Sequence, residues 1–216
     1  MINRKTVSLA DQVFETIEKN ILSGVYKKGE VLTEMKLSEE LGVSRTPIRE
    51  ALSALQQEHM LESKGKGMVV LGITAYDMQQ IFEIRKRIEG LAARECAINI
   101  RQEEIRELED TVELQEFYLN KNDSEKMQNY DGDFHALIYK YSGSPVYYDT
   151  LLPLHKKVQK YRQSSLEYQD RGEASIEEHR KILEAIKAHD AIKAQEEMER
   201  HVRNAEKNIL QMMEEA

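Results

Sequence analysis

The stretch that most constrains the fold runs from Thr33 to Glu50 and reads TEMKLSEELGVSRTPIRE. In its first half, Leu37 and Leu41 are four residues apart, which is helical spacing. Thr33 can cap the start of this helix, and Gly42 can end it in a left-handed backbone conformation. A second helix is expected to begin directly afterwards. Two short helices with so tight a connection predict a helix-turn-helix.

The second helix of this pair has the features of a helix that reads DNA. Ser44 is a suitable N-cap, and Pro47 falls in the first turn, where a missing N–H is tolerated. One face carries the aliphatic residues Ile48, Leu52 and Leu55. Arg45 and Arg49 lie four residues apart on another face, and arginine can bond guanine O6 and N7 through two nitrogens. An ordinary surface helix with two solvated arginines is the alternative interpretation of this pattern.

The sequence on either side favours the DNA-binding interpretation. An amphipathic helix is predicted over residues 9–22, and a turn over residues 24–29 follows it. After the helix pair, residues 61–71 read as two strands joined by a Lys/Gly turn, with Lys64 and Lys66 at its tip. A hairpin beside a helix-turn-helix is a wing, and its basic tip would lie close to phosphates or the minor groove.

This order of turn, helix, helix and wing resembles the N-terminal winged helix of the GntR family of bacterial transcription regulators. The run VSRTPIREAL, from Val43 to Leu52, is far more specific than a generic helix-turn-helix. The other matching residues are Gly24, Gly29, Leu32, Glu34, Leu37, Leu41, Gly42, Leu55 and Gly67. Two positions depart from the family's usual pattern: Lys28 stands where proline is common, and His59-Met60 where Gly-Leu is common.

The resemblance implies a sequence-specific transcription regulator, with a repressor as the expected type. Two winged helices of a homodimer would bind a pseudo-palindromic operator in double-stranded DNA. Arg45 and Arg49 are expected to read bases with help from Thr46, while the wing fixes the register. The expected DNA-contacting residues are Ser44, Arg45, Thr46, Arg49, Lys64, Lys66 and Gly67.

Charge divides unevenly along the 216 residues. Residues 1–72 contain 10 Lys+Arg and 10 Asp+Glu, so the remainder carries the whole net charge of −8. An acidic protein does not have the composition of a general nucleic-acid binder. The acidic part would repel phosphate and confine DNA contacts to the N-terminal part. We therefore predict a winged helix-turn-helix DNA-binding domain over residues 1–72, and a metal- and effector-binding and dimerisation domain over residues 75–216.

Compartment is indicated by the cysteine content and by the lack of long apolar runs. Cys96 is the only cysteine, which excludes an internal disulfide and suits a reducing cytoplasm. It lies in an apolar helical pattern, so we interpret it as a packing residue. Residues 1–5 do not resemble a signal peptide, and no apolar run approaches membrane-spanning length. A cytoplasmic protein with no membrane partner is expected.

From Ala75 onward the chain reads as helix after helix, with short loops and no strand signal. The predicted helices cover roughly 75–98, 102–119, 124–141, 146–170, 175–189 and 191–214. Helices joined by short loops predict an antiparallel bundle. The predicted fold is therefore mostly α, with a winged helix-turn-helix followed by an all-α antiparallel bundle.

Four residues of the predicted bundle form a candidate metal site. Asp131 and His135 are four residues apart and project from one face of a helix, whereas His179 and His201 lie on the apolar faces of two later helices. One carboxylate and three imidazoles suit a divalent ion, with zinc as the first choice and nickel or manganese as alternatives. A lone inward histidine is usually a hydrogen-bonded core residue, which is the alternative. His59, His155 and His189 lack this placement, and we interpret them as surface or turn residues.

Residues 75–212 resemble the FCD domain, the all-helical effector domain of the FadR-like branch of the GntR family. The matching residues are Arg85, Glu89, Asp131, Phe134, His135, Glu178, His179, Arg180, Ile182, Leu183, Ala185, Ile186, Asp190, Ala194, Met198 and His201. The four candidate ligands match the metal-binding form of this domain. The resemblance implies a divalent metal with open coordination positions and a small organic acid effector bound beside or onto it.

Three residues are candidate contacts of that effector: Arg85, Arg162 and Asn204. Arg85 could neutralise a carboxylate through two hydrogen bonds, and Asn204, one turn after His201, faces the same side. A structural salt bridge or a solvated surface position is the alternative for each of them.

Three functions remain open at this point. A regulator would couple effector binding to the relative placement of its two winged helices. A metal-dependent hydrolase would use the open coordination position to activate water. It would lack a separate general acid or base, because helical geometry turns Glu178 away from the side that His179 faces. A regulator with a purely structural metal would show no response of DNA binding to small acids.

Overall fold

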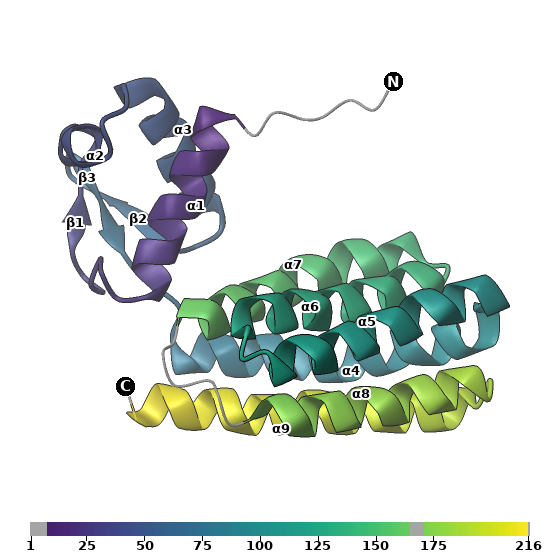
Figure 1. Cartoon of the computed structure of the whole chain (residues 1–216). Helices are drawn as coiled ribbons and strands as arrows, with labels where there is room; N and C mark the ends of the chain where they lie inside the picture. The colour runs from purple at the N-terminus through teal and green to yellow at the C-terminus, as the bar shows by residue number, and fades with distance from the viewer. Residues whose placement is uncertain (1–7, 165–170, 216) are drawn as a thin grey trace. The chain divides into compact units, whose positions relative to one another are not determined.

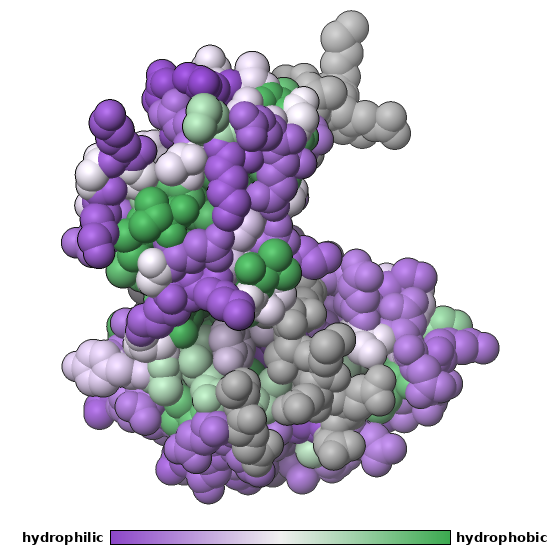
Figure 2. Space-filling model, turned by 90° about the vertical axis from the view of Figure 1, so that its left-hand side faces the viewer, coloured by the Kyte–Doolittle hydropathy of each residue, from purple (hydrophilic) through white to green (hydrophobic). Residues whose placement is uncertain are grey.

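A computed structural model describes residues 8–164 and 171–215 (Figure 1). The chain divides into two compact units between Thr74 and Ala75, and each is described by itself below. Helices dominate both units, which confirms the prediction of a mostly α fold. On the face shown in Figure 2, hydrophilic side chains predominate and apolar ones lie in separate groups.

The N-terminal unit has the predicted order of helices with a wing. Its elements are α1 (Leu9–Leu22), β1 (Val31–Leu32), α2 (Glu34–Leu41), α3 (Arg45–Gln57), β2 (Leu61–Lys64) and β3 (Gly67–Val70). The Thr33 hydroxyl accepts a hydrogen bond from the Lys36 N–H, and Gly42 ends α2 in the left-handed region with φ 67°. The aliphatic faces of α1, α2 and α3 meet in one core, which includes Ile17, Leu37 and Ile48.

The sheet contains a strand that the sequence analysis missed. Its order is β1-β3-β2, with both pairs antiparallel, and Val31 lies opposite Val69. A two-residue strand is too short to show an alternating pattern. Gly67 makes the pairing possible: a Cβ there would lie 2.6 Å from Val31 Cγ1 and 2.8 Å from the Leu32 carbonyl oxygen.

The C-terminal unit is a helical bundle. Its elements are α4 (Ala75–Asn99), α5 (Gln102–Asn120), α6 (Ser124–Tyr141), α7 (Pro145–Ser164), α8 (Gly172–Lys187) and α9 (Ala191–Glu215). α4 lies alongside α9 (Figure 1), and α8 packs on α9. Helix α8 begins three residues before the predicted Ser175. The predicted end of the preceding helix near residue 170 lies outside the described residues.

The structure also bears on the cysteine and on the apolar character of the helices. Cys96 is buried, and burial raises the pKa of its thiol to about 12, as suits a packing residue. Within residues 8–164 and 171–215, no helix combines the length and apolar character needed to cross a bilayer. Residues 1–5, interpreted above as no signal peptide, lie outside the described part of the chain.

Candidate functional site

Three buried imidazoles from three helices converge in the bundle. They belong to His135 on α6, His179 on α8 and His201 on α9. The Nε2 atoms of His135 and His201 are 3.2 Å apart, and those of His179 and His201 are 3.4 Å apart. Two nitrogens bound tetrahedrally to one zinc ion would be about 3.3 Å apart, given Zn–N bonds of roughly 2.0–2.1 Å. The spacing therefore fits three ligands of one ion.

The other ring nitrogen of each histidine faces a side-chain oxygen. For His135, His179 and His201 in turn, the oxygens near Nδ1 are Glu89 Oε2 at 3.0 Å, Gln115 Oε1 at 2.8 Å and Glu178 Oε2 at 2.7 Å. The oxygens of Gln115 and Glu178 can accept a proton from Nδ1 of His179 and His201, which leaves the lone pair of each neutral imidazole on Nε2, whereas Nδ1 of His135 forms no hydrogen bond with Glu89. Lone pairs that face one another in a buried site repel, and a cation between them removes the repulsion. This second set of contacts is the usual support of metal-bound histidines.

The protonation states also suit metal binding. Burial lowers the pKa of His179 to about 3, and burial lowers the pKa of His201 well below its ordinary value. Both imidazoles are therefore neutral at pH 7, as metal ligands must be.

Asp131 supplies a carboxylate beside these nitrogens. Its Oδ1 lies 3.7 Å from Nε2 of His179 and accepts a hydrogen bond from Ser175 Oγ at 3.3 Å. Burial by itself would raise the pKa of the Asp131 carboxyl, but the attraction of His179 and Arg162 outweighs it and lowers that pKa. The structure thus brings all four residues of the sequence-based metal set to one place.

His155 on α7 also lies at this site, so its interpretation as a surface or turn residue is wrong. Its side chain is buried, and its Nδ1 lies 3.0 Å from Nη2 of Arg85. A guanidinium only donates, so Nδ1 accepts and the proton of the neutral ring is on Nε2. Nε2 lies 3.8 Å from Asp131 Oδ2 and has no hydrogen-bond partner among the described residues. His155 therefore presents a donor, whereas His179 and His201 present lone pairs.

A sequence signal for His155 existed. The buried residues Leu151, His155, Val158 and Arg162 follow one another at helical spacings of four, three and four. A histidine on an apolar helical face is expected to point inward. His59 and His189, in contrast, have positive φ angles at turns, as interpreted from the sequence.

Two of the predicted effector contacts lie at the site. Arg85 is fully buried and forms an ion pair with Glu89. Burial alone would raise the pKa of Glu89, but the Arg85 charge overrides this and lowers that pKa to about 2. Arg162 on α7 has Nη1 at 3.7 Å from Asp131 Oδ2. Two guanidinium groups therefore flank His155 and Asp131.

Asn204, the third predicted contact, lies farther out. Its Nδ2 donates to Glu178 Oε1 at 2.8 Å, and the other Glu178 oxygen faces Nδ1 of His201. Arg171 also donates to Glu178, at 2.5 Å. Glu178 was expected from helical geometry to face away from the site, but its carboxylate contacts Nδ1 of His201 and orients that ring. Asn204 therefore acts on the site through Glu178.

A groove between α6 and α7 leads towards the buried cluster. Its volume is about 340 Å³, and Gly132, Leu152, His155, Lys156 and Gln159 contribute to its lining. Gly132 on α6 allows the Gln159 side chain of α7 to approach closely, since a Cβ at residue 132 would lie 3.0 Å from the Gln159 amide. His155 is thus the member of the cluster that borders this groove.

The predicted DNA-contacting residues are exposed on the N-terminal unit. Ser44, Arg45, Thr46 and Arg49 lie at the start of α3, Lys64 ends β2, and Lys66 lies in the wing turn. Gly67, which begins β3, is half-buried. The Ser44 side chain makes no cap hydrogen bond, and no acidic residue occupies the first turn of α3. N–H groups in such a turn can donate to a phosphate.

Arg49 has a partner that sequence spacing did not reveal. Its Nε and Nη2 donate to the two carboxylate oxygens of Glu34 at 2.7 and 2.8 Å. Arg49 and Glu34 also line a groove of about 320 Å³ that reaches Lys66 and Gly67 in the wing. The groove therefore joins the recognition helix to the wing.

Comparison with known proteins gives matches along most of the chain. Residues 9–70 match the family described as bacterial regulatory proteins, gntR family, and residues 80–204 match the FCD domain. YcbG of Bacillus subtilis, named as an uncharacterized HTH-type transcriptional regulator, is 31% identical, with 99% of this chain and 94% of the relative covered. The HTH-type transcriptional repressor RspR of Escherichia coli is 23% identical, with 97% and 92% covered.

A solved structure shows the same fold. The Escherichia coli protein McbR/YncC superimposes with a TM-score of 0.73 and 24% identity, covering 97% of this chain and 99% of that chain. At this level of identity the similarity is evidence for the fold alone.

Proposed function

The chain belongs to the GntR family of bacterial transcription regulators and carries an FCD domain, and on this basis we propose that it is a repressor controlled by a small organic acid. The acid would bind at or near a divalent metal in the bundle and change the affinity for operator DNA. The observation that carries the proposal is the convergence of three buried imidazole Nε2 atoms. The relatives named above are transcription regulators, so the hydrolase alternative is set aside.

The DNA-binding half of the proposal uses the exposed start of α3 and the wing. Arg45 and Arg49 read bases in the major groove, Ser44 and Thr46 assist, and Lys64, Lys66 and Gly67 of the wing fix the register. Two copies would bind a pseudo-palindromic operator as a homodimer. A regulator of this kind works in the cytoplasm, where its operator lies.

The metal half of the proposal assigns four ligands. Asp131, His135, His179 and His201 would hold one divalent ion, with zinc as the first choice and nickel or manganese as alternatives. The ion would supply a fixed positive charge at the centre of the bundle. Gln115 and Glu178 keep the imidazoles of His179 and His201 in the tautomer that ligation requires.

The effector would be recognised by donors on the α7 side of this centre. Arg85 and Arg162 supply positive charge, and His155 presents a proton on Nε2. Such a set suits a carboxylate, which only accepts hydrogen bonds when ionised. Asn204 contributes by holding Glu178 in place.

Covalent continuity offers a route from the effector to the DNA-binding unit. Arg85 lies on α4, which begins at Ala75, only five residues after β3 of the wing ends at Val70. A ligand held by α4 and α7 together would favour one placement of α4. The bound state would then favour one arrangement of the two winged helices.

Metal content is the first test. Elemental mass spectrometry on untagged protein, purified without added metal, should find about one equivalent in the wild type and little in His179→Ala, because a site that loses one of its few ligands binds poorly. His189→Ala is the matched control, since His189 lies at an exposed turn. No metal in the wild type or in the control would contradict the proposed centre.

Operator binding tests the regulatory half. Replacing Arg45 by Ala should cost roughly 1–3 kcal/mol of base discrimination. Small carboxylates screened against the metal-loaded protein should change operator affinity. If chelation lowers thermal stability but no acid alters DNA binding, the metal is structural and the effector half of the proposal fails.

A further inference from the structure

An ion pair joins the two helices of the helix-turn-helix on the unit proposed to bind DNA. Glu34 is the first residue of α2, and Arg49 lies in the second turn of α3. The Arg49 Nε and Nη2 atoms each donate to one carboxylate oxygen of Glu34, at 2.7 and 2.8 Å. Two parallel hydrogen bonds fix the plane of a guanidinium as well as its position. The Arg49 head group is therefore oriented, although its side chain is 68% exposed.

Both residues of this pair lie beside anchored neighbours. Thr33 caps α2 next to Glu34, and Leu37, one turn later, is fully buried. On α3, Ile48 precedes Arg49 and is also fully buried. The core of the unit thus sets the backbone positions of Glu34 and Arg49. The ion pair fixes what the backbone leaves free, which is the long Arg49 side chain.

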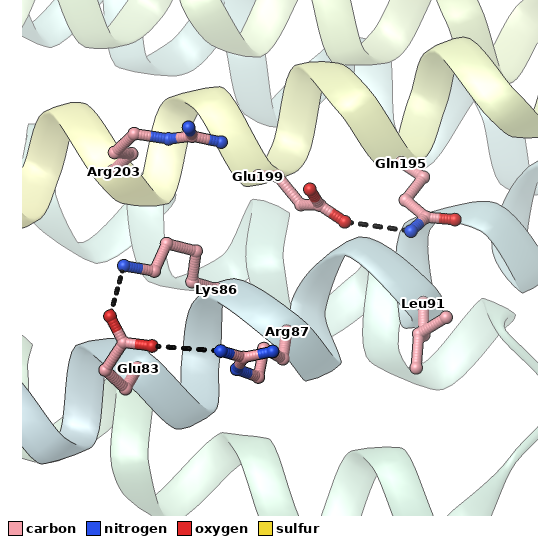
Figure 3. A pocket seen from close by; sticks show the side chains of 7 residues that line it. All are labelled: Glu83, Lys86, Arg87, Leu91, Gln195, Glu199 and Arg203. Carbon is pink, nitrogen blue, oxygen red and sulfur yellow. Dashed lines mark hydrogen bonds and ion pairs between the residues drawn. The ribbon is translucent and has the colours of Figure 1, made fainter.

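Stability alone gives little reason for so regular a pair. Exposed ion pairs contribute little to folding, because water screens them and ordering two long side chains costs entropy. A groove between α4 and α9 shows a looser arrangement, in which Glu83 divides its two oxygens between Lys86 at 2.6 Å and Arg87 at 3.7 Å (Figure 3). Glu34 instead commits both of its oxygens to one arginine of another helix.

The hydrogen bonds to Glu34 leave the outer edge of the guanidinium free. Glu34 occupies the edge formed by Nε and Nη2. The edge formed by Nη1 and Nη2 carries two further parallel N–H groups. Guanine O6 and N7 accept hydrogen bonds from two such groups. Arg49 can therefore be held by an acid along one edge and read a guanine with the other.

The pair also changes how Arg49 contributes to binding DNA of any sequence. Arg45, Lys64 and Lys66, the other cations proposed to face DNA, form no ion pair with the described residues, so their charge attracts every phosphate. Hydrogen bonding from Arg49 lowers the pKa of the Glu34 carboxyl, which is therefore ionised at pH 7. The opposite charges of the pair largely cancel for a phosphate, so Arg49 adds little to non-specific attraction.

We propose that Glu34 is a positioning residue for base recognition: it holds the outer edge of Arg49 towards a guanine and cancels the charge that would attract any phosphate. The inference rests on the proposed function, because it takes α3 as the recognition helix. It goes beyond that function by assigning sequence discrimination to an acid on α2. Glu34 and Arg49 also line the groove between α3 and the wing, so the proposed contact lies between the two DNA-binding elements.

Glu34→Gln in the full chain tests the inference. The probes are a duplex that the wild type selects from a random pool and a scrambled duplex of the same length and composition. Fluorescence anisotropy gives the ratio of the two dissociation constants, which measures discrimination. The ratio should fall at least about tenfold, within the range that one bidentate base contact supplies, because a glutamine side chain cannot accept from both Arg49 nitrogens.

Salt dependence is a second readout, which a merely structural role would not change. Without the Glu34 charge, Arg49 is free to neutralise a phosphate. The scrambled duplex should then bind more tightly, and the slope of log K against log salt should steepen by about 0.9 for each winged helix bound. Glu30→Gln is the matched control, since Glu30 pairs with Lys36 at 2.8 Å and is 29% exposed, against 33% for Glu34. This control should keep the wild-type discrimination.

A double variant separates positioning from direct contact. In an Arg49→Ala background, Glu34→Gln should leave discrimination unchanged, because the side chain that Glu34 positions is gone. Additive losses would show that Glu34 itself contacts a base, for example by accepting from cytosine N4, and would overturn the inference.

The remaining outcomes also decide. A wild type that discriminates, together with a Glu34→Gln variant that discriminates equally well, would overturn the inference and leave the regulator proposal intact. A wild type that binds every duplex equally would overturn both. If Glu34→Gln melts at a lower temperature and loses affinity for both duplexes to the same extent, the pair serves folding and the inference fails.

Discussion

At the scale of single residues, the partner of one ring nitrogen decides what the other can do. Gln115 donates its amide N–H to the Tyr130 carbonyl at 3.1 Å, which leaves its oxygen to accept from His179. His179 therefore offers a lone pair to the centre. His155 accepts from Arg85 and so offers a proton instead. Two buried histidines in one cluster thus have opposite roles.

His155→Leu should separate these roles. The variant loses the donor and keeps the four proposed ligands, so metal content should stay near one equivalent while carboxylate affinity falls roughly tenfold, the cost of a hydrogen bond to a charged group. Elemental mass spectrometry and titration calorimetry would measure the two effects. Loss of metal would show instead that His155 is a ligand.

Acid should destabilise the metal-free protein. Burial depresses the pKa of His179 to about 3 in the folded state, whereas its ordinary value is 6.5. Between these values the unfolded chain binds a proton that the folded chain does not, so the free energy of unfolding falls as pH is lowered through this window. The melting temperature of chelator-treated protein should drop between pH 7 and pH 5. An unchanged melting temperature would contradict a neutral, buried His179.

At the scale of secondary-structure elements, local chemistry made most helix ends predictable. Thr33 and Gly42 bound α2 through a cap and a left-handed residue, and Pro145 lies in the first turn of α7. Contacts between elements could not be predicted in this way. The Arg49–Glu34 pair joins residues 15 apart, and the close approach of strand β1 to β3 leaves no room for a Cβ at Gly67.

Gly67→Ala should test that approach. The added Cβ would meet the Leu32 carbonyl oxygen, a backbone atom that cannot move aside alone, so we expect a loss of roughly 1–3 kcal/mol in stability of the winged helix. Hydrogen exchange should accelerate in the β1 and β3 amides and remain unchanged in the bundle. Lys66→Ala, one residue away with an exposed side chain, should leave exchange unaffected.

The candidate site was predictable to the extent that its signals were local. The Asp131–His135 spacing and the apolar neighbours of His179 and His201 predicted the set that the structure brings together. The supporting residues were not predictable, because each reaches its histidine from another helix. Gln115 on α5 contacts His179 on α8, and Glu178 on α8 contacts His201 on α9.

At the scale of the whole molecule, the sequence separates charge as well as structure. The unit proposed to bind DNA is close to neutral, whereas the bundle is acidic. A single winged helix with so few basic residues would gain little from phosphate attraction. The proposed homodimer would add affinity by engaging two half-sites together.

The protein is therefore expected to bind a full operator roughly 10²–10⁴-fold more tightly than a single half-site, the range that linking two binding modules supplies. Fluorescence anisotropy with full and half operators measures both affinities. Equal affinities for the two DNAs would contradict binding by two linked winged helices.

The interior proline of α7 has a consequence for how such regulators diversify. Pro153 lacks an N–H for the preceding turn, so α7 is held less firmly by its own backbone than a regular helix. The three imidazoles of the proposed metal centre come from α6, α8 and α9, while His155 and Arg162 come from α7. Descendants of one ancestral gene could thus acquire a different chemical signal by substitutions along α7, while inheriting the metal-holding framework intact.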